Sequence, residues 1–188
     1  MNTDQKQTND SLKANRPMLS GMFPNSDSVE RAYNTISEKG YTPDDIHLIM
    51  SDETRKKYYS GHIKETVLGT KAAEGAGKGS AIGGAIGAAA GIVAAIGTSL
   101  VIPGLGLVIA GPLAAGIAGA GAGGITGGVI GALVGSGIPE ARAKIYESGV
   151  KNGYIVLGVH PRNREDAEYI EKSWRENNAQ EIHHEPIS

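Results

Sequence analysis

The sequence predicts an α+β protein interrupted by a long helical insert, and three observations lead to this prediction. The 61 residues between Lys78 and Glu140 carry no charged side chain. Within and just before this run, glycine recurs at every fourth position in two series, and 21 of the 28 glycines lie between Gly75 and Gly137. The segments on either side have ordinary globular composition, with short apolar runs typical of strands and amphipathic runs typical of helices.

The two glycine series are the most regular feature of the chain. A spacing of four places the glycines along one side of an α-helix, where a second backbone can approach closely. We therefore predict a glycine-zipper hairpin, in which two helices pack through two glycine columns. The first column is Gly75, Gly79, Gly83, Gly87 and Gly91, and the second is Gly119, Gly123, Gly127, Gly131 and Gly135.

The stretch from Leu100 to Pro112 separates the two columns and reads LVIPGLGLVIAGP. Proline and glycine break helices, so this stretch is expected to be the turn of the hairpin. The predicted turn residues are Pro103, Gly104, Gly106 and Pro112.

The flanking segments have similar layouts. The first reads as a short strand at 18–23, a helix that ends at Gly40 and a buried strand at 46–50. The second reads as a helix at 139–150, a buried strand at 154–160, a helix at 163–177 and a weak strand at 181–184. Two β-α-β units predict a ferredoxin-like four-stranded sheet with its helices on one face, split by the hairpin. Residues 17–70 and 138–188 would then form one α/β domain, 71–137 the inserted hairpin, and 1–16 a disordered tail.

Composition excludes several classes of function. The absence of cysteine rules out disulfides and thiolate zinc sites. A net charge of -2, with one Phe and one Trp, argues against nucleic-acid binding. The first sixteen residues are polar and lack the apolar core of a secretory signal, so we expect a cytoplasmic protein.

The chain offers little that could carry catalysis or bind a cofactor. The run Gly119 to Gly124 fits G-x-G-x-x-G, but the strand that must precede a dinucleotide fingerprint is not expected inside a glycine repeat. A phosphate-binding loop around Lys78 lacks its first glycine and its Ser or Thr after the lysine. We therefore expect no cofactor.

The histidines and carboxylates also favour structural roles. His183 and His184 are neighbours on a predicted strand, so their side chains point to opposite faces and do not readily share one metal ion. His47 and His160 lie in predicted inner strands and could approach each other across the sheet, although a satisfied core histidine is the commoner case. Acidic residues fall at turns and helix starts, as helix caps do. No Ser-His-Asp arrangement is apparent, so we expect no metal site and no enzyme.

Several motifs resemble a known family. Pro43-Asp44-Asp45-Ile46, the stretch Val101 to Gly106, and Gly137-Ile138-Pro139-Glu140 through Gly153 look like the bacterial general stress proteins, a group with heat-induced and low-temperature-induced members. The likeness covers roughly residues 18–184. It implies a stress-responsive protein, and it carries over no catalytic residues.

The hairpin is therefore the expected functional element. The stretches 80–100 and 113–136 are long enough to cross a bilayer, but alanine and glycine drive insertion only weakly. Lysines before and after the hairpin would keep both of its ends cytoplasmic, with the turn in or across the bilayer. One hypothesis is thus a hairpin in the inner membrane through residues 80–136, with lipid as its partner. The other is a soluble homo-oligomer that buries the hairpins, and a small-ligand-binding module is a third, based on fold analogy alone.

Overall fold

A computed structural model describes residues 16–59, 100–102, 106–112, 114, 128–135 and 138–184. These residues form a mixed α/β fold around a six-stranded sheet whose neighbouring strands are antiparallel. Residues 52–59 are helical as well. The other elements are β1 (Leu19–Phe23), α2 (Ser26–Glu38), the 3₁₀ turn η1 (Pro43–Asp45), β2 (Ile46–Ser51), β3 (Leu100–Ile102), β4 (Leu107–Ala110), α6 (Gly128–Gly135), α7 (Glu140–Lys151), β5 (Ile155–Val159), α8 (Arg164–Glu176) and β6 (Gln180–His183).

The strand order is β3-β4-β2-β5-β1-β6. β5 lies in the middle and pairs with both β1 and β2, which come from the first flanking segment. The two flanking segments therefore share one sheet although the glycine-rich run separates them in sequence. The strands and helices expected in these segments from residues 18–50 and 139–184 are confirmed.

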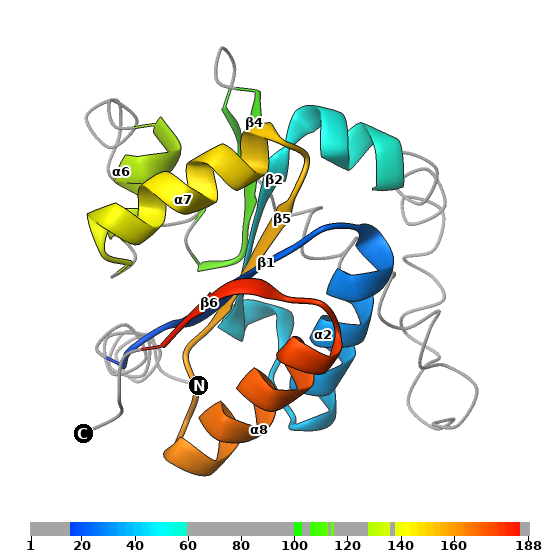
Figure 1. The fold of residues 1–188 in the computed structure, drawn as a ribbon, viewed down its shortest axis with the longest axis vertical. Helices are drawn as coiled ribbons and strands as arrows, with labels where there is room; N and C mark the ends of the chain where they lie inside the picture. The colour runs from blue at the N-terminus through cyan, green and yellow to red at the C-terminus, as the bar shows by residue number, and fades with distance from the viewer. Residues whose placement is uncertain are drawn as a thin grey trace, which may run out of the picture.

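The sheet is buried on both faces. Along β2, Leu48 and Met50 contribute to one apolar core, and Ile49 between them contributes to the other. The alternation of a strand sends successive side chains to opposite faces, so an uninterrupted apolar run requires cover on both sides. Figure 1 shows α2 and α8 on one side of the sheet and α6 and α7 on the other.

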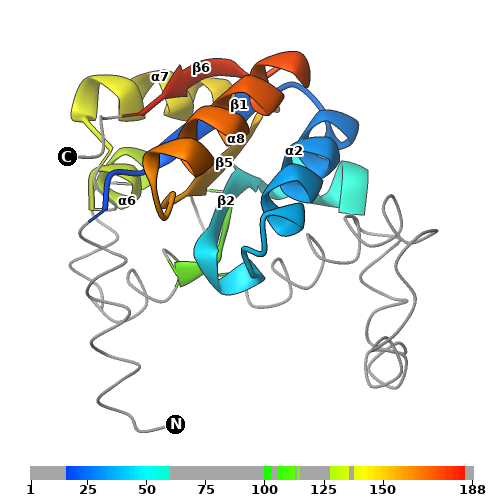
Figure 2. The ribbon, with the colours of Figure 1, turned by 90° about the horizontal axis from the view of Figure 1, so that it is seen from below.

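The first core lies between the sheet and the pair α2 and α8, which Figure 2 shows side by side. Trp174 of α8 is fully buried there and meets the ring of Phe23 edge-on at 5.4 Å between centroids. Each helix begins at an asparagine whose side-chain oxygen accepts a backbone N–H, Asn25 for α2 and Asn163 for α8. These caps satisfy N–H groups that a helix start leaves without a partner.

The second core corrects the expectation that the helices lie on one face. α7 covers the opposite face through Ala143, Tyr146 and Val150, and α6 adds Leu133. A strand that is buried on both sides has the same apolar sequence whether a given helix packs on one face or on the other. The position of α7 is therefore set by the sheet's need for cover on its second side.

The connecting stretch 100–112 also differs from its expected role as the turn of a helical hairpin. Leu107–Ala110 pairs with Leu48–Ser51, and β3 pairs with β4, so this stretch extends the sheet. Gly111 ends β4 with φ +87, and a Cβ there would lie 2.0 Å from the carbonyl oxygen of Ile46. Only glycine fits so close to the neighbouring strand in this conformation.

Other expectations fall on residues outside the described part, including residues 1–15 of the tail predicted at 1–16 and most of the predicted insert. Within the described ranges, no helix has the length and apolar character needed to cross a membrane.

Membership of β4 in the domain is testable by mutation. Ile109 of β4 is fully buried between the sheet and α7, so Ile109→Ala should lower the free energy of unfolding by about 2–5 kcal/mol. Ile145→Ala removes the same atoms from a side chain that is 39% exposed and should cost much less. Equal effects of the two changes in chemical denaturation would show that β4 is not part of the cooperative unit.

Candidate functional site

Most of the predicted helix-packing glycines lie outside the described residues, namely Gly75, Gly79, Gly83, Gly87, Gly91, Gly119, Gly123 and Gly127. Gly131 and Gly135 lie on α6. A Cβ at Gly131 would meet no heavy atom of the described residues within 4 Å. Gly131 thus lies on a part of α6 that the described residues do not crowd, and the glycine columns stay a prediction.

Of the four predicted turn residues, three lie between β3 and β4 and one follows β4. Pro103 and Gly104 lie outside the described residues, whereas Gly106 is exposed and turns the chain into β4 with φ +61. Pro112 is exposed and follows Gly111 at the end of β4. Gly106 and Pro112 therefore flank a strand of the sheet.

α7 is attached to the sheet by one buried hydroxyl. The Tyr146 hydroxyl lies 3.0 Å from Ser20 Oγ of β1 and donates a hydrogen bond to the carbonyl oxygen of Glu181 at 2.7 Å. Burial raises the pKa of Tyr146 to about 12, so this hydroxyl keeps its proton at neutral pH. Arg142 pairs with the Glu181 carboxylate, so α7 is tied to the end of the sheet at two points.

A second polar cluster joins the two flanking segments on the other side of the molecule. Tyr41, from the turn before β2, donates a hydrogen bond to Asp166 Oδ2 at 2.8 Å and accepts one from the Arg162 backbone N–H at 2.8 Å. The Arg162 guanidinium binds the same carboxylate oxygen at 3.0 Å and lies 4.2 Å from the Tyr41 ring centroid. Because the hydroxyl, the carboxylate and the guanidinium of this partly buried cluster bond to one another, the cluster stabilises the junction of the segments.

The Tyr41 cluster yields a second prediction. Tyr41→Phe removes a hydroxyl that serves Asp166 and the Arg162 N–H, so it should lower the free energy of unfolding by about 1–3 kcal/mol. Tyr169→Phe is the matched control, because Tyr169 is 44% exposed on the same helix as Asp166. Thermal or urea unfolding would measure both, and a Tyr41→Phe protein as stable as Tyr169→Phe would contradict the assigned role.

The histidines His47 and His160 do come together. His47 lies on β2 and pairs in register with Gly158. His160 lies two residues after Gly158 and directly follows the end of β5. Residues two apart on a strand share a face, so both rings lie on the α7 side of the sheet. Their centroids are 5.2 Å apart with the rings nearly perpendicular. His160 Nδ1 lies 2.7 Å from the carbonyl oxygen of Arg16.

Both histidines are held in the neutral form. Burial, together with a smaller effect of the neighbouring His160, lowers the pKa of His47 from 6.5 to about 3, and Asp45 opposes the change. Burial also lowers the pKa of His160, against the effect of its bond to the Arg16 carbonyl. Two uncharged imidazoles in van der Waals range are suited to binding a metal ion or polar ligand, and poorly suited to transferring protons at neutral pH.

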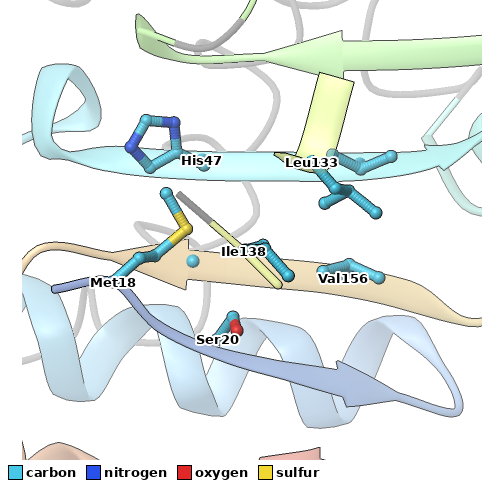
Figure 3. A pocket seen from close by; sticks show the side chains of 8 residues that line it. Met18, Ser20, His47, Leu133, Ile138 and Val156 are labelled. Carbon is cyan, nitrogen blue, oxygen red and sulfur yellow. The ribbon is translucent and has the colours of Figure 1, made fainter. Parts of the chain in front are cut away.

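A small cavity of about 10 Å³ lies beside His47. Figure 3 shows Met18 reaching towards His47 across the strand, with Leu133 and Ile138 on the other side of the cavity. This volume holds about one water-sized particle. The cavity is too small for an organic substrate.

The remaining candidate residues do not converge on a site. The glycines of the G-x-G-x-x-G run and Lys78 lie outside the described residues. His183 ends β6 and His184 follows it, and both are half-buried. Within the described ranges, no three or more His, Cys, Asp or Glu residues are grouped so that they could hold a metal ion.

Sequence reasoning pointed to the histidine pair but missed its neighbours. Met18 directly precedes the short strand β1 and Ser20 lies on it, with no local signal of a site, and they reach the pair only through the register of β1 with β5. A scan against protein-family models and searches of curated proteins and of solved structures found no match to this chain.

Proposed function

We propose that this chain is a non-enzymatic stress-response protein whose glycine-rich segments drive self-association from a cytoplasmic α/β domain. The observation that best supports this proposal is the pairing of β4 with β2, together with the packing of α6 against α7. The β4–β2 pairing holds the chain to the domain between the two glycine columns. The packing of α6 on α7 holds it at the end of the second column. The domain would act as a platform, and the glycine columns would be the surfaces that meet in an assembly.

The composition of the glycine-rich run supports association. A run of 61 residues without charge is too large an apolar surface to leave uncovered on a monomer. Glycine at every fourth position lets helix backbones touch, which favours packing of like helices on one another. A homo-oligomer that buries the columns would cover this apolar surface and would let the helices pack through their glycines.

Association with the inner membrane through residues 80–136 is the alternative, and the uncharged run flanked by lysines favours it. A hairpin across a bilayer would carry its turn away from the domain. β4, within that turn, instead forms hydrogen bonds to β2. This favours assembly of the protein with itself over insertion.

We also propose that β1, α2, β2, β5, α8 and β6 form a ferredoxin-like core carrying a glycine-zipper insert. The order β2-β5-β1-β6 and the shared face of α2 and α8 support this part of the proposal. β3, β4, α6 and α7 would then be additions to the core. The stress-response part rests on the resemblance of residues 43–46, 101–106 and 137–153 to the general stress proteins.

Fractionation of cells and sizing of the protein test the proposal. The protein should be recovered in the fraction without membranes, and light scattering without detergent should give a mass of several chains. Recovery with membranes after a carbonate wash would support the bilayer alternative. A monomer in the membrane-free fraction would overturn both.

The glycine columns are tested one position at a time. Replacing Gly83 or Gly127 with Leu places a side chain where backbones should touch, and should reduce the oligomer in light scattering and crosslinking. Ile82→Leu and Ile130→Leu preserve side-chain bulk next to the columns and should leave the oligomer intact. Equal tolerance at glycine and isoleucine positions would mean that the columns are not contact surfaces.

A further inference from the structure

Three side chains suited to a soft metal ion meet on the α7 side of the sheet. β1 and β5 pair through Leu19 and Val159, so Met18 and His160 are the adjacent residues at the same end of both strands. His47 is opposite Gly158 on the next strand. Met18, His47 and Gly158 all border the small cavity described above.

The spacing of the imidazoles fits one bound ion. With metal–nitrogen bonds of about 2 Å, two imidazoles on one tetrahedral ion have ring centroids about 5 Å apart. The centroids of His47 and His160 are 5.2 Å apart. The rings meet edge to face at this distance, so an ion would enter by rotation of the two side chains, while the strands already hold the imidazoles at the separation that one ion needs.

The Arg16 carbonyl orients one of the two rings. A carbonyl oxygen only accepts hydrogen bonds, so His160 Nδ1 must carry the proton of this 2.7 Å contact. In the neutral ring the lone pair is then on Nε2. A backbone carbonyl that fixes one nitrogen while the other binds the metal is the usual arrangement around metal-binding histidines.

Gly158 makes room for a third ligand. A Cβ at this position would lie 2.8 Å from Met18 Sδ and 3.5 Å from the His47 Cβ. The missing side chain lets the thioether lie over β5 and extend towards His47, as Figure 3 shows. The adjoining cavity of about 10 Å³ is large enough for one ion and for little else.

We propose that His47, His160 and Met18 bind one Cu(I) ion. A thioether with two neutral imidazoles is a soft donor set that selects Cu(I), whereas structural zinc takes four nitrogen, sulfur-thiolate or carboxylate ligands. A single positive charge also costs less to bury than a double one. The site is independent of the self-association proposed above, because His47 lies on β2, Met18 directly precedes β1 and His160 directly follows β5.

Titration of the full-length protein tests the site. Under anaerobic conditions, Cu(I) is added in competition with a chromophoric Cu(I) chelator, and one ion per chain should bind. Met18→Leu and His47→Gln should each weaken binding by at least about tenfold, since both remove a ligand. Met22→Leu, on the same face of β1, and His183→Gln should bind copper as the unaltered protein does.

Met18→Leu keeps side-chain volume and so should fold even if His47→Gln does not. One Cu(I) ion should also raise the thermal midpoint of the unaltered protein and of Met22→Leu, but not that of Met18→Leu. The proposal is wrong if the unaltered protein takes up no copper, if Met18→Leu and Met22→Leu bind it equally, or if His183→Gln abolishes binding. Stoichiometric zinc retained in place of copper would also overturn the choice of ion.

Discussion

The need to cover both faces of the sheet determines where the helices of this protein lie. β2 and β5 are buried on both sides, and each side chain such as Ile49 or Val156 contributes about 1.5–3 kcal/mol when it is removed from water. α2 and α8 cover one face. The other face is covered by α7 and by α6, which is the last part of the uncharged run. A segment that composition sets apart from the domain is therefore part of the domain's core.

The face covered by α6 and α7 also contains the polar groups that are not explained by packing alone. Tyr146 joins α7 to two strands through its hydroxyl. His47 lies at the small cavity that Leu133 also lines, and His160 lies beside His47. Gly158 leaves space on this face of the sheet, because β5 has no side chain at that position. The opposite face holds Trp174 and a closely packed apolar core, with the bonded Tyr41–Asp166 pair at its rim. Within the described part of the chain, the histidine pair and Tyr146 therefore lie on the side of the sheet that α7 covers.

Much of the fold could be predicted from the sequence where the signals are local. The helix start at Asn163 and the apolar runs of β2 and β5 depend on neighbouring residues, and they were predicted at the right places. β3 and β4 were missed because runs of three and four residues between prolines and glycines read as a turn. The face on which α7 packs was missed because a strand with apolar residues on both faces does not indicate which face a given helix covers. The histidine pair was foreseen as a possibility, but Met18 and the Tyr41–Asp166 contact depend on strand register and on pairing between distant segments.

The pairing of β2 with β4 has a consequence for how the chain folds. These strands are joined through residues 52–106, which include the first glycine column. Loop-closure entropy rises only with the logarithm of length, so doubling such a connection costs about 0.6 kcal/mol. The length of the glycine-rich segment is therefore nearly neutral for the final stability. This length does affect the rate of folding, because contacts between residues that are distant in sequence form slowly. Until β4 arrives, β2 has an unpaired apolar edge, and the newly made chain is open to pairing with other chains for as long as that takes.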